Sequence, residues 1–523
     1  MSVLGERLNG SVVVKEYTSI IKSSLFRELL ILFALGIATV LFSIYNYNLQ
    51  PWTLDDAFIT FRYAENFVEG KGIVYNEGEY VEGYTCFLWL IILAGVKELG
   101  FDIVTASKLL GTLFTFFSLL LLSRIHKIVK CTSWFISLAS TLILGSFGCF
   151  TAWAMSGMET SMTGFWVLAT FLLYAALTSR GSTSWFGYFL IGVLIALATM
   201  SRIDAGIILP PIFLCVLYES WKIKKWSLPI ALIVGFGILY CPYFIWRWYY
   251  YGWILPNTFY VKVGSSWDQI ERGLDYTKYF LLSSSILLIP VVFSQMLSGK
   301  ALGNDRLFVI SSGGAVFLQF LYVIIVGGDC MPAYRFFAPI APLIAILASY
   351  GLSIESFSKW KSYIALVIIV CFNFWQCYND KSLFDRIISD TVAEVGRESG
   401  EWLRKNAPQN SLLATNTAGS VAYYSRLRVI DMLGLNDEHI AHRHIPNLGK
   451  GFAGHEKGDG KYVLSRKPDY IMFGSASGNK SPRFLSDREI AIEKEFAENY
   501  VYRTYPLPSG KVLHIYERKK NNR

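Results

Sequence analysis

The sequence predicts a polytopic α-helical membrane protein with a soluble C-terminal domain of α/β or mixed architecture. Three observations lead to this fold class. Of the 523 residues, 53% are hydrophobic and 17% are charged, whereas soluble domains carry about 25% charged residues. The apolar residues form long blocks such as Leu29–Tyr45, close to the ~20 residues that cross a bilayer. After Asn379 such blocks stop and charged residues become frequent.

About eleven apolar segments have the length of a membrane helix or come close to it. They are 28–48, 102–123, 132–150, 160–178, 185–200, 205–219, 228–246, 279–297, 307–326, 336–355 and 362–378. The apolar segment Tyr84–Leu99 is short and ends at a Lys-Glu pair, so we expect a helix in the outer interface. The predicted parts are an N-terminal segment 1–27, a transmembrane domain 28–378 with its first outer loop at 49–101, and a C-terminal domain 379–523.

The distribution of basic residues predicts the orientation. Alternate loops, beginning with the N-terminal segment, contain lysine or arginine, as in Arg124–Lys130 and Lys222–Lys225. Cytoplasmic loops carry this excess, so the segment 1–27 is cytoplasmic and the C-terminal domain is extracytoplasmic. We expect a multi-pass protein of the cytoplasmic (inner) membrane whose main surroundings are the lipid bilayer. The net charge of +9 belongs largely to these loops and does not indicate a nucleic-acid partner.

Two patterns in the C-terminal domain are weak signals. Gly449–Gly454 matches GxGxxG, but Pro446 before it and Gly458 after it interrupt the strand–turn–helix unit of a dinucleotide site. His439, His442 and His444 lie close in the sequence, but they lack a fourth ligand for zinc. Neither pattern predicts a cofactor.

An adjacent acidic pair follows the first span. Asp55 and Asp56 open an amphipathic segment that ends at Gly70 and Gly72, as a short helix would. One aspartate as an N-cap would be a purely structural role. Two adjacent carboxylates at the membrane face favour a second role for at least one, as general base or metal ligand. The spans hold almost no ionisable residues at their centres, which disfavours a transporter.

Further motifs occur in a fixed order along the chain. They are Asp55–Ala64, Gly70–Glu79, Val81–Thr85, Ser156–Thr160, Ser201–Asp204, Leu255–Lys262, Gly327–Phe336, Asp431–Leu435 and Gly454–Lys457. Together they resemble the C-type (GT-C) glycosyltransferase superfamily, most closely its terminal arabinofuranosyltransferase branch. The resemblance extends from about Trp52 to Pro468.

This resemblance implies an enzyme that transfers a sugar, arabinofuranose in the nearest branch, from a polyprenyl-phosphate donor to a glycan or glycolipid acceptor. It also implies an essential acidic residue in the first outer loop, which is Asp55 or Asp56 here. The resemblance does not choose between the two, and we place Asp55 first and Asp56 second. Lipid phosphate is a good leaving group, so such an enzyme needs a base at the acceptor hydroxyl and cations or N–H donors at the phosphate.

The outer loops supply the remaining candidates. The predicted donor phosphate and sugar site consists of Arg202, Asp204, Asn257, Lys262, Asp329 and Arg335. The predicted acceptor site consists of Glu82, Tyr84, His455 and Glu456. The alternative for Arg202 is a structural ion pair with Asp204, and for Arg335 a pair with Asp329. Glu82 has the alternative of an electrostatic helix cap.

Three questions stay open at this stage. No cofactor is required, but a divalent cation (Mg, Mn or Ca) at Asp55, Asp56 and Glu82 is an alternative, since carboxylates alone do not identify a metal. A polyprenyl-linked glycan transporter or flippase is a second function, although no polar path through the spans is evident. A non-catalytic membrane glycan-binding protein is a third, and the intact acidic pair argues against it.

Overall fold

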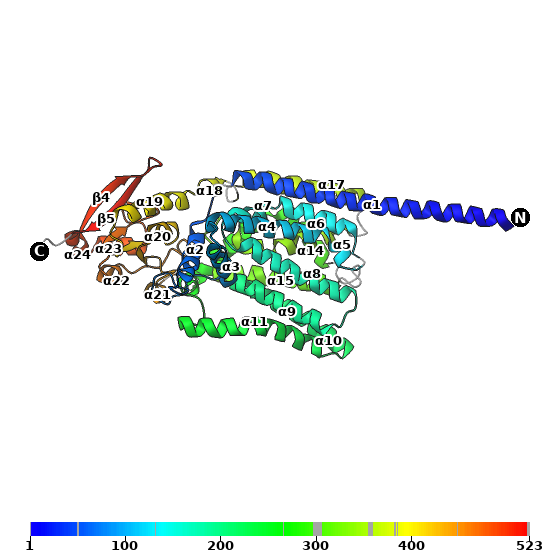
Figure 1. The fold of residues 1–523 in the computed structure, drawn as a ribbon, viewed down its shortest axis with the longest axis horizontal. Coiled ribbons are helices and arrows are strands. Elements are labelled where there is room, and N and C mark those ends of the chain that lie inside the picture. Colours follow the sequence, from blue (N-terminus) through cyan, green and yellow to red (C-terminus); the bar gives the residue numbers. More distant parts are fainter. Residues whose placement is uncertain are drawn as a thin grey trace.

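A bundle of long helices carries a small mixed domain at one end (Figure 1). The structure is a computed structural model and describes residues 2–49, 52–130, 132–264, 266–296, 306–353, 359–380, 383, 385–446 and 448–519. Helix α1 (Ser2–Asn48) begins far from the small domain and runs toward it. Helix α17 (Lys359–Asn379) lies beside α1 and leads into the small domain.

Eight helices in the described ranges are long and apolar enough to cross a membrane. They are Ser24–Asn48 within α1, α4 (Ile103–Ser123), α8 (Thr160–Ser179), Ile203–Ile223 (η2, Ile203–Ile208, with α10, Leu209–Ile223), α11 (Ser227–Tyr251), α15 (Arg306–Val326), Arg335–Leu352 (η4, Arg335–Ile340, with α16, Ala341–Leu352) and α17. A ninth span would be α6 (Trp134–Ser146) with Gly148–Met155 (α7, Gly148–Thr151, and η1, Ala152–Met155), which meet at a bend of 63°.

The predicted count of eleven spans is not confirmed. Helix α9 (Trp185–Ser201) has 17 residues, and the predicted span 279–297 is divided between α13 (Trp267–Ser283) and α14 (Ser285–Met296). Residues 297, 354 and 355 at the ends of two predicted spans lie outside the described residues. The expected interfacial helix is α3 (Phe87–Glu98), which at 12 residues is too short to cross.

Glycine allows one of the close crossings in the bundle. A Cβ atom on Gly192 of α9 would lie 2.0 Å from the Leu232 carbonyl oxygen of α11, and one on Gly235 of α11 would lie 2.0 Å from the Phe189 oxygen. Small residues let membrane helices approach to backbone contact. The pair α9–α11 therefore depends on a glycine from each helix.

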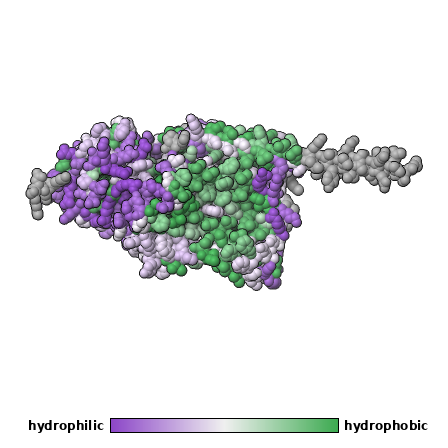
Figure 2. All heavy atoms as spheres, viewed as in Figure 1, coloured by the Kyte–Doolittle hydropathy of each residue, from purple (hydrophilic) through white to green (hydrophobic). Residues whose placement is uncertain are grey.

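The surface is divided into zones along the long axis. Figure 2 shows a hydrophobic band over the helices, a hydrophilic small domain at one end and a narrow hydrophilic rim at the other. Helix α5 (Ile125–Ile128) and the end of α10, which carry the basic loops 124–130 and 222–225, lie at the rim (Figure 1). The small domain and these basic loops thus occupy opposite ends of the hydrophobic band, as predicted.

The C-terminal domain contains one five-stranded mixed sheet, which confirms the predicted class. Its helices are α18 (Asp385–Ile388), α19 (Val392–Asn406), α20 (Ser420–Ser425), α21 (Glu438–His442), α22 (Gly460–Ser465), α23 (Leu485–Ala491) and α24 (Lys494–Asn499). Its strands are β1 (Leu412–Thr415), β2 (Arg428–Asp431), β3 (Tyr470–Met472), β4 (Tyr500–Pro506) and β5 (Val512–Arg518), in the order β2-β1-β3-β5-β4. Strand β1 is parallel to β2 and β3, and β5 is antiparallel to β3 and β4.

The first outer loop anchors this domain. Helix α2 (Asp55–Val68) carries the buried Arg62, whose guanidinium donates to the carbonyl oxygens of Ala422 at 2.6 Å and Leu427 at 2.7 Å. The Tyr75 hydroxyl donates to the Ala418 oxygen at 2.6 Å. A buried arginine needs several acceptors because its desolvation is costly. The loop and the C-terminal domain therefore form one interface, and the candidate site lies beside it.

Candidate functional site

Two cavities meet where α2 approaches the C-terminal domain. The membrane-side cavity, of about 140 Å³, is lined by the first outer loop, which includes Thr60 and Tyr84, by other outer loops and by the outer ends of membrane helices, which include Arg335. The domain-side cavity, of about 320 Å³, is lined by the start of α2, by 330–332 and by loops of the C-terminal domain at 416–418 and 452–455. Five residues line both cavities: Asp56, Ile59, Lys262, Leu435 and Ala453.

Asp55 caps a helix of the C-terminal domain. Its carboxylate accepts hydrogen bonds from the Ser420 N–H at 2.8 Å, the Ser420 hydroxyl at 2.5 Å and the Gly419 N–H at 3.2 Å. Burial raises the pKa of Asp55 to about 6, although the bonds from Ser420 lower it. The N-cap of α2 itself is Leu54, with no side-chain capping bond. The alternative that an aspartate caps α2 is therefore wrong, because the carboxylate of Asp55 caps α20.

Asp56 has a different environment. It is the next residue of α2, it is partly exposed, and it lines both cavities. No hydrogen bond or ion pair joins its carboxylate to another residue within the described part of the chain. Burial lowers the pKa of His455, and the negative charge of Asp56 opposes that shift. Asp56 is thus a carboxylate at the junction of the cavities that none of the described residues pairs with.

Charged side chains of both signs surround the membrane-side cavity. Its cations are Arg202, Lys262, Arg272 and Arg335, and its carboxylates are Asp56, Glu159, Asp204 and Asp329. Arg202 donates to both oxygens of Asp204 at 3.0 Å and to Glu159 at 3.0 Å. Arg335 Nε lies 2.8 Å from Asp329 Oδ2, although neither atom has a hydrogen-bond partner in the described residues, so the contact is an ion pair.

Lys262 differs from these arginines. It lies at the end of α12 (Asn257–Lys262), is partly buried and lines both cavities. No carboxylate forms an ion pair with it in the ranges that the structure describes. Its charge lowers the pKa of His455. Lys262 is therefore the lining cation whose charge is least neutralised by the protein.

Arg272 joins the site although the sequence analysis did not select it. It lies on α13 and donates to the Gly327 oxygen at 2.8 Å, the Gly451 oxygen at 2.9 Å and Glu456 Oε2 at 2.8 Å. Its Nη2 is buried without a hydrogen-bond partner among the described residues. The signal available in the sequence was the charged start of α13, Trp267–Asp275, which belongs to a predicted outer loop.

Three of the predicted residues have other partners. Asn257 Nδ2 donates to the oxygens of Gly434 at 2.8 Å and Leu435 at 3.1 Å, and Asn257 does not line either cavity. Glu82 is buried and paired with Arg247, whose Nε donates to both carboxylate oxygens at 3.0 Å. Tyr84 does line the membrane-side cavity, and its hydroxyl lies 3.1 Å from that of Tyr251.

His455 and Glu456, the predicted acceptor residues of the C-terminal domain, have different environments. His455 lines the domain-side cavity, and burial lowers its pKa. Glu456 Oε1 accepts from the N–H groups of Gly449 at 2.8 Å and Gly451 at 2.7 Å. The amides of the GxGxxG-like segment are thus bonded to a carboxylate of the same chain, which leaves them unsuited to a dinucleotide phosphate.

The candidate metal ligands are dispersed. Asp55 binds α20 and Glu82 binds Arg247, whereas Asp56 lines the cavities. In the C-terminal domain, His439 Nε2 lies 3.0 Å from Asp459 and His442 is stacked on Trp253. No group of three histidine, cysteine, aspartate or glutamate residues within the described ranges is placed to hold a metal ion.

Relatives with curated functions resemble this chain in sequence. The chain is 25% identical over 383 residues to a terminal β-(1→2)-arabinofuranosyltransferase of Corynebacterium glutamicum, which covers 62% of the chain and 51% of that protein. It is 24% identical over 345 residues to the enzyme of the same name from Mycobacterium tuberculosis, covering 58% of the chain and 52% of the relative. The chain thus spans about half the length of the curated relatives it matches.

Solved structures share the fold. ArnT from Cupriavidus metallidurans, bound to undecaprenyl phosphate, gives a TM-score of 0.54 at 12% identity and covers 76% of this chain and 85% of ArnT. The oligosaccharyltransferase AglB from Archaeoglobus fulgidus, in complex with an inhibitory peptide and a dolichol-phosphate, gives 0.55 at 11% identity, with 94% and 74% coverage. Residues 386–516 match a family model described as a domain of unknown function, DUF8728.

These comparisons confirm the resemblance read from the motifs. The chain is homologous to terminal β-(1→2)-arabinofuranosyltransferases and shares its fold with GT-C glycosyltransferases. Its homologues are named arabinofuranosyltransferases, which are glycosyltransferases.

Proposed function

We propose that this chain transfers a sugar, arabinofuranose by analogy with its homologues, from a polyprenyl-phosphate donor to a hydroxyl group of a glycan or glycolipid acceptor. The single observation that carries the proposal is that Asp56 lines two cavities, one formed by outer loops and the outer ends of membrane helices and one formed largely with the C-terminal domain. A transferase must bring a lipid-linked donor and a polar acceptor to one catalytic group. A carboxylate without a structural partner at the junction meets that requirement.

In this proposal Asp56, rather than Asp55, is the general base. Asp56 accepts the proton of the acceptor hydroxyl group, while the hydroxyl oxygen of the acceptor forms the new bond to C1 of the donor sugar. The bond between C1 and the phosphate oxygen breaks, and the phosphate keeps the electron pair. This reverses the preference derived from the sequence, because Asp55 already accepts three hydrogen bonds from Gly419 and Ser420.

Cations of the membrane-side cavity stabilise the leaving phosphate. Lys262 contributes most, since no carboxylate forms an ion pair with it among the described residues. Arg335 and Arg272 add positive charge that Asp329 and Glu456 partly neutralise. Positive groups fixed in a desolvated site stabilise developing negative charge more than they would in water. Asp204 and Asp329 then hold arginines in place and do not contact the donor.

The domain-side cavity receives the acceptor. It is lined by His455 and by Asn416–Ala418 of the C-terminal domain, which suits a polar substrate that arrives from the aqueous side. The basic loops lie at the opposite end of the hydrophobic band. By the positive-inside rule the site therefore faces the outside of the cytoplasmic membrane.

The test uses the full-length chain in liposomes with a synthetic polyprenyl-phosphoryl arabinofuranose and an arabinofuranosyl oligosaccharide. Asp56→Asn should lower turnover about a hundredfold or more, the usual scale of general base catalysis, while donor binding is retained. Asp102→Asn is the matched control, because Asp102 caps α4 by accepting the Thr105 N–H at 2.8 Å and lines neither cavity. Asparagine caps as well as aspartate, so this variant should keep full activity.

Several outcomes would contradict the proposal. Wild-type turnover in Asp56→Asn would remove Asp56 as the base. Donor bound by the wild type but never transferred would favour the non-catalytic glycan-binding alternative. Movement of the donor across the bilayer without transfer would favour the flippase.

A further inference from the structure

A third hollow opens on the outer surface, away from the two cavities. It is a groove of about 720 Å³ between the first outer loop, the turn after α11 and the C-terminal domain. Its aromatic and imidazole side chains are Tyr80, Trp253, His439, His442 and Tyr462. None of these residues lines either cavity. We call this hollow the outer groove.

The rings of the outer groove are arranged in two stacked pairs. His439 and His442 are three residues apart on α21 and therefore lie on one face. His439 stacks on Tyr462 with centroids 4.0 Å apart, and His442 stacks on Trp253 at 3.9 Å. Trp253 is 39% exposed and Tyr80 is 55% exposed. The groove thus offers accessible aromatic surface that the protein itself leaves uncovered.

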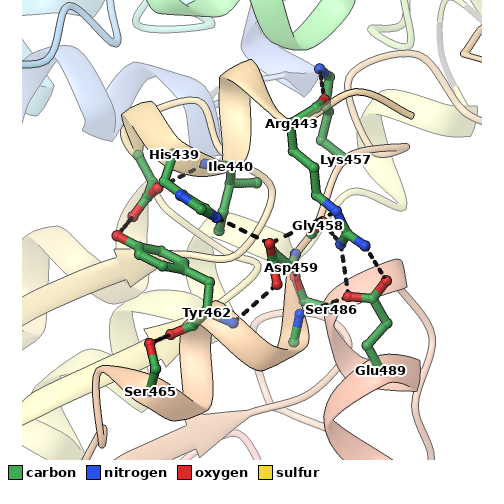
Figure 3. Close-up of polar contacts among 12 residues, drawn as sticks. His439, Ile440, Arg443, Lys457, Gly458, Asp459, Tyr462, Ser465, Ser486 and Glu489 are labelled. Atoms are coloured by element: carbon green, nitrogen blue, oxygen red, sulfur yellow. Dashed lines mark hydrogen bonds and ion pairs between the residues drawn. The ribbon is translucent and has the colours of Figure 1, made fainter.

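Polar groups of the groove are held firmly (Figure 3). Asp459 lies 3.0 Å from His439 Nε2 and accepts the Tyr462 N–H at 3.0 Å. Arg443 donates to both carboxylate oxygens of Glu489, at 2.8 and 2.9 Å. Groups that are already fixed lose little conformational entropy when a ligand binds. The groove is therefore preorganised.

The charge of the lining restricts the class of ligand. Four carboxylates, Glu79, Asp437, Glu438 and Asp459, face two guanidinium groups, Arg443 and Arg466. This excess of negative charge disfavours a phosphate or another anion. It suits hydroxyl groups, which donate to carboxylates and accept from guanidinium groups.

We propose that the outer groove binds a neutral carbohydrate chain, namely the part of the glycan acceptor that lies beyond its reacting sugar. Sugar rings combine C–H faces, which pack against the negative faces of aromatic rings, with a rim of hydroxyl groups that meets the polar lining. That this carbohydrate chain is the acceptor rests on the proposed function. Recognition of a carbohydrate rests on the groove alone.

The position of the groove agrees with this role. The turn after β2 separates it from the cavities: Leu435 lines both cavities, whereas Asn436 and Asp437 line the groove. An acceptor with its end in the domain-side cavity can thus have its body one turn away in the groove. This arrangement would make the enzyme prefer long acceptors.

The experiment measures binding without the donor, by calorimetry on the full-length protein. The probes are an arabinofuranosyl hexasaccharide and a mannosyl hexasaccharide. Trp253→Ala should weaken binding of the better probe about tenfold, the order of one aromatic contact. Trp253→Phe keeps a ring and loses only the bond from Nε1 to Glu438, so it should retain most of the affinity.

Trp402→Ala is the matched control. Trp402 also stacks on a ring of the C-terminal domain, that of Tyr505 at 4.1 Å, but it does not line the groove. Equal affinities in Trp253→Ala and the wild type, or equal losses in both alanine variants, would overturn the proposal. Tryptophan-dependent binding of a sulfated hexasaccharide in preference to both neutral probes would also overturn it.

A second measurement separates this inference from the proposed function. With the donor present, Trp253→Ala should raise the KM for the hexasaccharide about tenfold and leave kcat and the KM for a disaccharide unchanged. Hexasaccharide binding that depends on Trp253 in a protein without transferase activity would support the groove and reject the transferase. Transfer whose kinetics depend neither on Trp253 nor on the length of the acceptor would support the transferase and reject the groove.

Discussion

At the scale of single residues, neighbours in the sequence have opposite roles. Asp55 bonds to α20, whereas Asp56 lines the two cavities. Successive residues of a helix with 3.6 residues per turn point about 100° apart. Asp55 thus contacts the C-terminal domain and also borders the domain-side cavity, whereas Asp56 is the one of the two that lines both cavities. The composition of the pair does not reveal which one faces the substrate.

The titration of Asp55 gives a prediction about stability. Burial raises its pKa from 3.8 to about 6, so the folded protein holds this proton more tightly than the unfolded chain. The contribution of Asp55 is therefore fully present below about pH 4 and is lost as the pH rises through 6. Asp55→Asn has no proton to lose. The Tm of the variant minus that of the wild type should increase between pH 4 and 7.

Thermal unfolding of both proteins across that range checks this prediction. Asp431, whose pKa is also raised to about 6 by burial, is present in both proteins and cancels in the difference. A difference in Tm that is independent of pH would show that Asp55 titrates normally.

Lys262 and Arg202 should respond differently to loss of charge. Lys262→Met keeps most of the side-chain length and should lower donor affinity about tenfold or more, as expected for a charge-assisted contact of about 1.5–3 kcal/mol. Its Tm should change little. Arg202→Met leaves the buried Asp204 and Glu159 without their cation, so it should destabilise the protein by about 3–5 kcal/mol.

Donor binding and thermal unfolding of the two variants distinguish these roles. A large loss of stability in Lys262→Met would show that Lys262 has a structural role. A loss of donor affinity without destabilisation in Arg202→Met would show that Arg202 binds the donor.

At the scale of elements, α20 is the contact that joins the acidic pair to the C-terminal domain. Gly419 precedes it with φ −86°. A Cβ atom there would lie 2.0 Å from the Asp55 carbonyl oxygen and 2.5 Å from its carboxylate. The glycine is therefore needed for the close approach of α20 to α2.

Gly419→Ala should force α20 away from α2. We expect a loss of about 1–3 kcal/mol, typical of overpacking, and faster amide hydrogen exchange at 419–425 than in β1. Gly95→Ala in α3 is the control, because nothing lies within 4 Å of its added methyl group. Unchanged exchange at 419–425 in Gly419→Ala would show that the α2–α20 contact does not hold the domain.

At the scale of the whole molecule, the zones of the surface predict the orientation. The basic loops and the C-terminal domain lie at opposite ends of a hydrophobic band (Figure 2). In a background without native cysteines, a membrane-impermeant thiol reagent should label Ser477→Cys in intact cells and label Ser227→Cys only after the cells are opened. The positive-inside rule gives this direction. Labelling of Ser227→Cys alone in intact cells would reverse the orientation.

Much of the fold could be predicted because it depends on local pattern. The length of the apolar blocks predicts most of the membrane spans, and the shortness of segment 84–99 predicts that α3 does not cross the membrane. Strands β1, β2, β3 and β5 coincide with short hydrophobic stretches. Helix α14 was not separated from α13 because both continue one apolar block across Ser284. Strand β4 is an edge strand in which only Tyr500 is buried and three of the seven residues are exposed, so no regular buried face marks it in the sequence.

The sequence by itself determined the membrane class, the C-terminal domain, the likeness to glycosyltransferases and the set of charged residues from which a site can be built. Only the tertiary structure decided how that set is divided. It pairs Glu82 with Arg247 and Asn257 with the turn at 434–437, brings in Arg272, and leaves Asp56 and Lys262 at the junction of two cavities. The physical reason is that a buried charge must find a partner, and partners come from segments far apart in the chain. A charged side chain that has no partner among the described residues can therefore be recognised only when the partners of the other charged side chains are known.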